Sequence, residues 1–167
     1  MVRYSENPTA RVEVHVAAPP EAVWPLVSDI SVPARFSTEL AGAEWLDGSD
    51  GPCVGARFTG RNHHDAIGDW QSTCVVVTCA AGQAFGWVVG DPAYPSARWG
   101  FELEARDGGT CLRQWASLGP APSGLTPAIT AMPDKEERIV ARRLAEHEAN
   151  MRRCVEGIKA LAEGGRP

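Results

Sequence analysis

The C-terminal stretch at residues 134–163 constrains the fold of this chain more than any other feature of its sequence. Its apolar positions recur at steps of three and four residues, which predicts one amphipathic helix of roughly 30 residues, about 45 Å long. These positions are Val140, Leu144, Met151, Val155, Ile158 and Ala162. A helix with such a stripe needs an apolar surface of matching length to pack against, and the rest of the chain must supply it.

The preceding residues supply that surface as strands. Polar and apolar residues alternate strictly over residues 11–16, which predicts a first strand. Six further strand candidates, separated by turn residues, lie at 43–46, 55–62, 70–78, 85–89, 98–105 and 110–118. Residues 20–27 and about 32–38 predict two short helices, whereas the proline-rich residues 119–133 predict a loop or a broken helix. We therefore predict an α+β helix-grip fold, in which a seven-stranded curved antiparallel sheet wraps around the C-terminal helix, with two short helices between strands 1 and 2.

Composition narrows the class of protein. At 167 residues and 44% hydrophobic, the chain is predicted to form a single domain over 1–167, with its core at about 10–163. A net charge of -5 makes nucleic acid a poor partner, since there is no basic surface to neutralise phosphates. No apolar run is long enough to span a bilayer, and the first residues lack a leader's apolar segment, so we expect a cytoplasmic protein without a membrane span. The five cysteines are an odd number without a CxxC pair, which predicts reduced and mostly buried thiols.

Several short motifs accompany this order of elements. They are residues 18–24 with 27–30, residues 55–58 with Gly60 and Asn62, then Trp70, Trp99, residues 108–110, and Asn150 with Met151 in the last helix. Together they resemble the START-like, or SRPBCC, superfamily, and within it the polyketide cyclase/dehydrase branch. The resemblance covers almost the whole chain. It implies a deep, mainly apolar cavity between sheet and helix that holds a hydrophobic small molecule, such as a polyketide, a lipid or an aromatic compound.

The fold does not select one reaction, so three functions stay open. The leading one is binding of a hydrophobic small molecule by a cyclase/dehydrase-like protein. The first alternative is an active polyketide cyclase/aromatase or dehydratase. In relatives a Trp-x-Ser-x-Arg strand carries a pocket arginine, but residues 70–74 read Trp-Gln-Ser-Thr-Cys and the family's tyrosine falls near Leu40. A neutral thiol cannot replace a five-donor guanidinium, which leaves catalysis undecided. The second alternative is a protein-interaction module without ligand, which would have a small cavity and a large exposed apolar patch.

Candidate site residues follow from which side chains face the cavity. His147 falls within the apolar stripe of the last helix, so it is either an acid–base catalyst, together with Ser72, or a histidine of the cavity wall. On the strand at 55–62 we predict that Phe58 and Asn62 face inward and Arg57 and Arg61 face solvent. The alternative gives Arg57 or Arg61 a role in binding carbonyl or carboxylate groups. The predicted ligand-binding residues are Phe58, Asn62, Trp70, Cys74, Trp87, Trp99, Leu144 and Met151.

No feature predicts a cofactor. His63, His64 and Asp65 are adjacent, but neighbouring strand residues face opposite sides and are poorly placed to bind one metal ion. Glycine-rich phosphate loops are absent from the sequence. We therefore expect neither metal nor cofactor, a hydrophobic small molecule as partner, and a monomer or homodimer.

Overall fold

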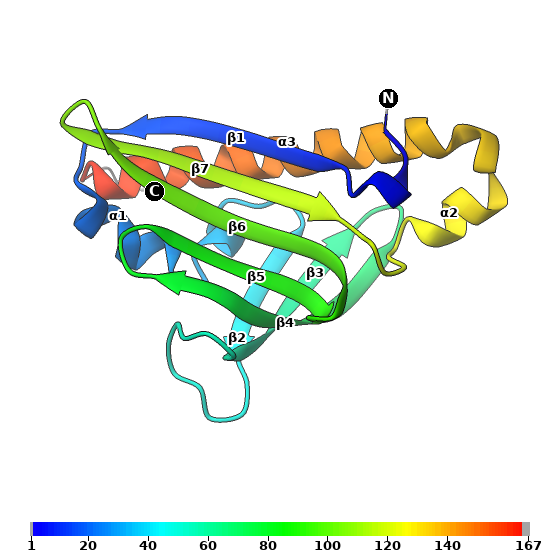
Figure 1. Cartoon of the computed structure of the whole chain (residues 1–167), viewed down its shortest axis with the longest axis horizontal. Coiled ribbons are helices and arrows are strands. Elements are labelled where there is room, and N and C mark those ends of the chain that lie inside the picture. The colour runs from blue at the N-terminus through cyan, green and yellow to red at the C-terminus, as the bar shows by residue number, and fades with distance from the viewer. Residues whose placement is uncertain (1, 165–167) are drawn as a thin grey trace.

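Seven strands form one antiparallel sheet that curls over the C-terminal helix (Figure 1). The computed structural model describes residues 2–164. Along the sheet the order is β1-β7-β6-β5-β4-β3-β2, so only β1 pairs out of sequence, with β7. The strands are β1 (Thr9–Val16), β2 (Leu40–Trp45), β3 (Arg57–His64), β4 (Gly68–Ala80), β5 (Ala84–Asp91), β6 (Tyr94–Arg106) and β7 (Gly109–Leu118). The predicted sheet is confirmed.

The long helix α3 (Glu136–Ala162) runs alongside β1 and β7, behind them in Figure 1. The short helix α1 (Pro20–Val27) forms as predicted, but the second one is a single 3-10 turn, η2 (Pro33–Arg35). The proline-rich segment contains α2 (Thr126–Ala131), and short 3-10 turns lie at η1 (Tyr4–Glu6) and η3 (Pro133–Lys135). None of the helices among residues 2–164 combines the length and the apolar character needed to cross a bilayer.

The core lies where α1 and the C-terminal half of α3 meet β1 and β7. Met151, Val155 and Ile158 of the predicted stripe are fully buried against Val12 and Leu112 of the sheet cluster. Burial of each such side chain stabilises the fold by roughly 1.5–3 kcal/mol. Three of the five cysteines, Cys74, Cys111 and Cys154, are buried, and all five are free thiols as predicted.

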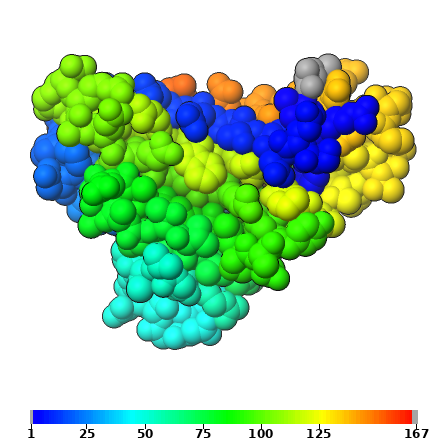
Figure 2. All heavy atoms as spheres, viewed as in Figure 1, coloured from blue at the N-terminus to red at the C-terminus, as the bar shows by residue number. Residues whose placement is uncertain are grey.

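The loop that leads from η2 to β2 is fastened to α3. The Phe36 ring packs on Gly157, where an added Cβ would come within 2.5 Å of the ring, so only glycine admits this contact. Two turns earlier on the helix, Asn150 Oδ1 accepts hydrogen bonds from the Thr38 backbone N–H (2.9 Å) and hydroxyl (3.0 Å). These contacts hold one end of the helix against the segment before β2. At the other side of β2, the connection to β3 projects from the body as a separate lobe (Figure 2).

Candidate functional site

A cavity of about 470 Å³ lies between the concave face of the sheet and α3. Its volume falls in the range of small-molecule sites, roughly 300–1,000 Å³. Inward-facing residues of β3 to β7 form one wall, and Arg143, His147, Asn150, Met151 and Cys154 of α3 form the other. Six aromatic side chains belong to the sheet wall: Phe58, Trp70, Phe85, Trp87, Trp99 and Phe101.

The aromatic wall is an ordered set of ring contacts. Trp87 and Trp99 stack with an interplanar angle of 5° and ring centroids 6.4 Å apart. Phe58 meets Trp87 edge-on at 5.9 Å, and Trp99 meets the His147 ring edge-on at 4.9 Å. Such a flat apolar surface suits an aromatic or polycyclic ligand.

His147 reaches the cavity from α3, as predicted, and is only 5% exposed. Among the described residues its ring nitrogens have no hydrogen-bond partner. Burial lowers the pKa of His147 to about 3, and the nearby positive charge of Arg143 lowers it further. The imidazole is therefore neutral and a weak base at neutral pH, so it is better suited to hydrogen bonding than to proton transfer.

Ser72 and Cys74 lie on β4 and both line the cavity. Burial raises the pKa of Cys74 to about 12, so its thiol stays protonated. The thiol is therefore an uncharged group of the cavity wall at neutral pH.

The structure places most of the predicted residues on the cavity wall. Phe58, Asn62, Trp70, Ser72, Cys74, Trp87, Trp99, His147 and Met151 all line it. Arg57 and Arg61 face solvent, as expected, and pair with Asp47 at 2.6 Å and Glu44 at 3.6 Å.

Leu144 is the exception, because it is absent from the cavity wall and packs against the hydrophobic core instead. Leu144 shares its face of α3 with Met151, which does line the cavity, so the helix period does not distinguish the two positions. A contact between Leu144 and ligand stays a prediction, with Leu144 outside the cavity wall.

Gln114 of β7 is a site residue that the sequence reasoning missed. It is 4% exposed, lines the cavity, and its Oε1 has no hydrogen-bond partner in the described part of the chain. The signal was available, since alternation along the strand puts Gln114 on the inward face between Leu112 and Ala116. A polar residue in that row is unusual for a core strand.

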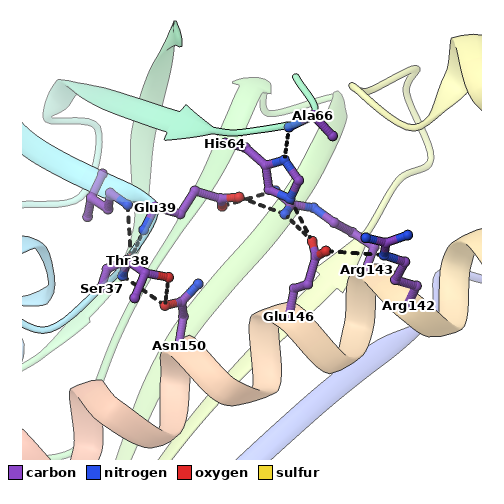
Figure 3. Close-up of polar contacts among 10 residues, drawn as sticks. Ser37, Thr38, Glu39, His64, Ala66, Arg142, Arg143, Glu146 and Asn150 are labelled. Carbon is purple, nitrogen blue, oxygen red and sulfur yellow. Dashed lines mark hydrogen bonds and ion pairs between the residues drawn. The ribbon is translucent and has the colours of Figure 1, made fainter. Parts of the chain in front are cut away.

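A second missed feature is a polar cluster beside the cavity, formed by Glu39, His64, Arg143 and Glu146 and called the Arg143 cluster below (Figure 3). Arg143 donates to both carboxylate oxygens of Glu39, at 2.6 and 3.0 Å, and to Glu146 Oε2 at 2.9 Å. The side chains of Arg143 and Glu39 are only 11% and 13% exposed. The cluster joins the segment before β2 to α3.

His64 connects the end of β3 to the same cluster. The backbone N–H of Ala66 donates to His64 Nδ1 at 3.0 Å, so the ring carries its proton on Nε2 and donates it to Glu146 Oε2 at 3.1 Å. Burial opposes the ionised form of Glu146, but the hydrogen bonds from Arg143 and His64 outweigh it and lower the pKa of this carboxyl.

His63, the neighbour of His64 in sequence, is not part of the Arg143 cluster and pairs with Asp69 at 2.6 Å. Within residues 2–164, no group of three His, Cys, Asp or Glu side chains is arranged to hold a metal ion.

A sheet that grips a long helix across an apolar cavity defines a helix-grip protein of the START-like class. Residues 7–163 match the family model described as polyketide cyclase / dehydrase and lipid transport. The chain therefore belongs to this polyketide cyclase/dehydrase family. No curated protein matches the sequence significantly.

Solved structures agree with this assignment. A Polyketide_cyc-like protein of Corynebacterium glutamicum is 30% identical, with 92% of this chain and 90% of that one covered and a TM-score of 0.62. The di-domain ARO/CYC protein BexL from the BE-7585A biosynthetic pathway shares 14% identity and a TM-score of 0.70, covering 98% of this chain and 53% of that one. Ara h 8.0201 shares 14% identity and a TM-score of 0.59, with 95% and 99% of the two chains covered. At these identities the last two establish the fold alone.

Proposed function

We propose that this protein binds a hydrophobic small molecule of the polyketide, lipid or aromatic class in the cavity between its sheet and α3. The observation that carries the proposal is the 470 Å³ cavity with its wall of contacting aromatic rings. Membership of a family described by polyketide cyclases, dehydrases and lipid transport supports the same class of ligand. The cytoplasmic location, the single domain and the monomeric or dimeric state stay predictions from the sequence.

The two alternatives receive less support. A protein-interaction module should have a small cavity and a large exposed apolar patch. Here the exposed large apolar residues of the described chain are Val2, Val54, Ile67, Val77, Tyr94 and Met132, which come from six separate segments. A cyclase or dehydratase would use Ser72 and His147, which both line the cavity, but the low pKa of His147 makes it a poor base.

Filling the cavity tests the proposed function. Phenylalanine at position 72 would occupy cavity space, whereas phenylalanine at the exposed position 73 points out of the other face of β4. Native and denaturing mass spectrometry of the gently purified protein should show a co-purifying small molecule. We expect Ser72→Phe to lose this molecule and the matched control Thr73→Phe to keep it.

Two results would contradict the proposal. One is a molecule that is retained equally by Ser72→Phe and Thr73→Phe, since it would then bind elsewhere. The other is a protein that purifies empty and binds no added hydrophobic compound. Circular dichroism of both variants checks that the comparison is made between folded proteins.

A further inference from the structure

Two buried polar side chains, one from the sheet and one from α3, line the cavity. His147 of α3 is 5% exposed and Gln114 of β7 is 4% exposed, and both line the cavity. Gln114 Oε1 is fully buried and has no hydrogen-bond partner within the described chain. A buried polar group without a partner is destabilising, so a ligand that hydrogen-bonds to these groups gains affinity over an apolar molecule of the same shape. The site thus favours a ligand that carries a polar group.

The charges around the cavity decide which polar group is acceptable. Arg143 is the one permanently cationic side chain on the cavity wall among the described residues, and both of its terminal nitrogens already bind carboxylates. Two carboxylates, Glu39 and Glu146, face this single guanidinium, and Glu146 also accepts a hydrogen bond from His64 Nε2. Asp29 adds a further carboxylate to the cavity wall. A ligand carboxylate would therefore find no free cation and would meet like charge.

We propose that the cavity selects uncharged aromatic molecules that carry a hydroxyl group and rejects aromatic carboxylates. Gln114 and His147 provide the hydrogen bonds to the hydroxyl-bearing ligand. Glu39 causes the rejection of carboxylate ligands, because it binds the guanidinium of Arg143, which could otherwise bind an anion. This selectivity rests on the proposed function and specifies the ligand class for the same cavity.

Three small probes of matched shape test the selectivity by equilibrium dialysis at neutral pH. They are 2-naphthol, 2-methylnaphthalene, in which a methyl replaces the hydroxyl, and the anion 2-naphthoate. We expect the unchanged protein to bind 2-naphthol at least about 10-fold more tightly than 2-naphthoate, which corresponds to about 1.4 kcal/mol. In Gln114→Leu, the affinity for 2-naphthol relative to 2-methylnaphthalene should fall about 10-fold, the scale of an unsatisfied buried hydrogen-bonding group. A ratio of the affinities for two probes, measured with the same protein preparation, does not depend on the fraction of the protein that is folded.

The rejection of anions is tested by a gain of binding. Glu39→Gln removes the main partner of Arg143 and one negative charge, so the affinity for 2-naphthoate relative to 2-naphthol should rise about 10-fold. Glu44→Gln is the matched control, because Glu44 is on the exposed face of the adjoining β2 strand and pairs with the exposed Arg61. This control removes the same charge and an exposed ion pair without touching the cavity, so the ratio should stay unchanged.

The possible outcomes distinguish a failure of the proposed ligand binding from a failure of the selectivity alone. If neither 2-methylnaphthalene nor 2-naphthol binds, the proposed function fails and the selectivity fails with it. If both bind but 2-naphthoate binds equally well, or the ratio is the same in Gln114→Leu, only the selectivity is overturned. Equal ratios in Glu39→Gln and Glu44→Gln would overturn the role of Glu39.

Discussion

His147 links the cavity to the stability of the whole fold. Its imidazole is buried beside Arg143, which binds Glu39 and Glu146, and its pKa is about 3 in the folded protein. His64 belongs to the same cluster and donates a hydrogen bond to Glu146. In the unfolded chain a histidine has a pKa near 6.5. Between these two values the unfolded state binds a proton that the folded state excludes, so acid selectively stabilises the unfolded chain.

Replacing His147 should therefore flatten the dependence of stability on pH. The free energy of unfolding of the unchanged protein should fall as the pH is lowered from about 6.5 towards 4, with His147 contributing up to roughly 1.4 kcal/mol per pH unit. The other charged groups titrate in both proteins, so His147→Leu should show a smaller slope by this amount. Urea denaturation at a series of pH values measures both slopes.

The matched control for this measurement is His15→Leu, which makes the same change at an exposed histidine of β1. Its slope should equal that of the unchanged protein. Parallel slopes for the unchanged protein and His147→Leu would show that the buried imidazole does not exclude the proton.

At this scale the sequence predicts some contacts and misses others for physical reasons. The period of two in β3 correctly puts Phe58 inward and Arg57 outward, because an apolar aromatic fixes the face of a strand. The period of a helix cannot separate cavity from core along one stripe, which is why it did not distinguish Leu144, packed against the core, from the cavity-lining Met151. The pair of Glu39 with Arg143 joins residues 104 positions apart, and no local spacing encodes such a contact.

The segment before β2 shows how one element is shaped by another. Residues 32–38 were predicted to be helical, but helix forms only at Pro33–Arg35. Beyond it, Phe36 docks on Gly157, and Thr38 bonds to Asn150 of α3. These contacts outweigh local propensity, which is a weak determinant when tertiary packing competes. α3 itself was predicted almost to its ends, because its periodicity extends over many turns.

Gly157 provides a test in which two effects have opposite signs. Alanine is favoured over glycine within a helix by about 1 kcal/mol. Its Cβ, however, would lie 2.5 Å from the Phe36 ring and would force that ring out of place. We expect the clash to win and Gly157→Ala to be destabilising by roughly 1–3 kcal/mol, as overpacked core positions are. Chemical denaturation measures the difference.

Removal of the Phe36 ring should reverse the effect of Gly157→Ala on stability. In a Phe36→Ala background the Cβ at position 157 meets no ring, so Gly157→Ala should then be stabilising by up to about 1 kcal/mol. If Gly157→Ala remains equally destabilising without Phe36, the contact between η2 and α3 is not its cause.

The whole molecule is built as two layers around the cavity, which the sequence predicted because a long apolar stripe and a seven-strand meander can cover each other in few ways. The volume and charge of the cavity depend on side chains from many elements, so the pattern of residues along the sequence does not predict them.

Each layer has one buried cysteine on the cavity wall. Cys74 belongs to the sheet and Cys154 belongs to α3. Burial raises the pKa of each thiol to about 12. Neither should react with a thiol reagent until the structure opens.

If sheet and helix unfold as one cooperative unit, the two thiols should become reactive at the same rate. We expect Cys74 and Cys154 to be labelled together in a variant whose other cysteines, Cys53, Cys79 and Cys111, are serine, with peptide mass spectrometry distinguishing the sites. A ligand that bridges the layers should slow both rates by one common factor, since it binds only the closed state. Labelling of Cys154 well before Cys74 would instead mean that α3 leaves the sheet on its own, and the cavity would then open by detachment of the helix.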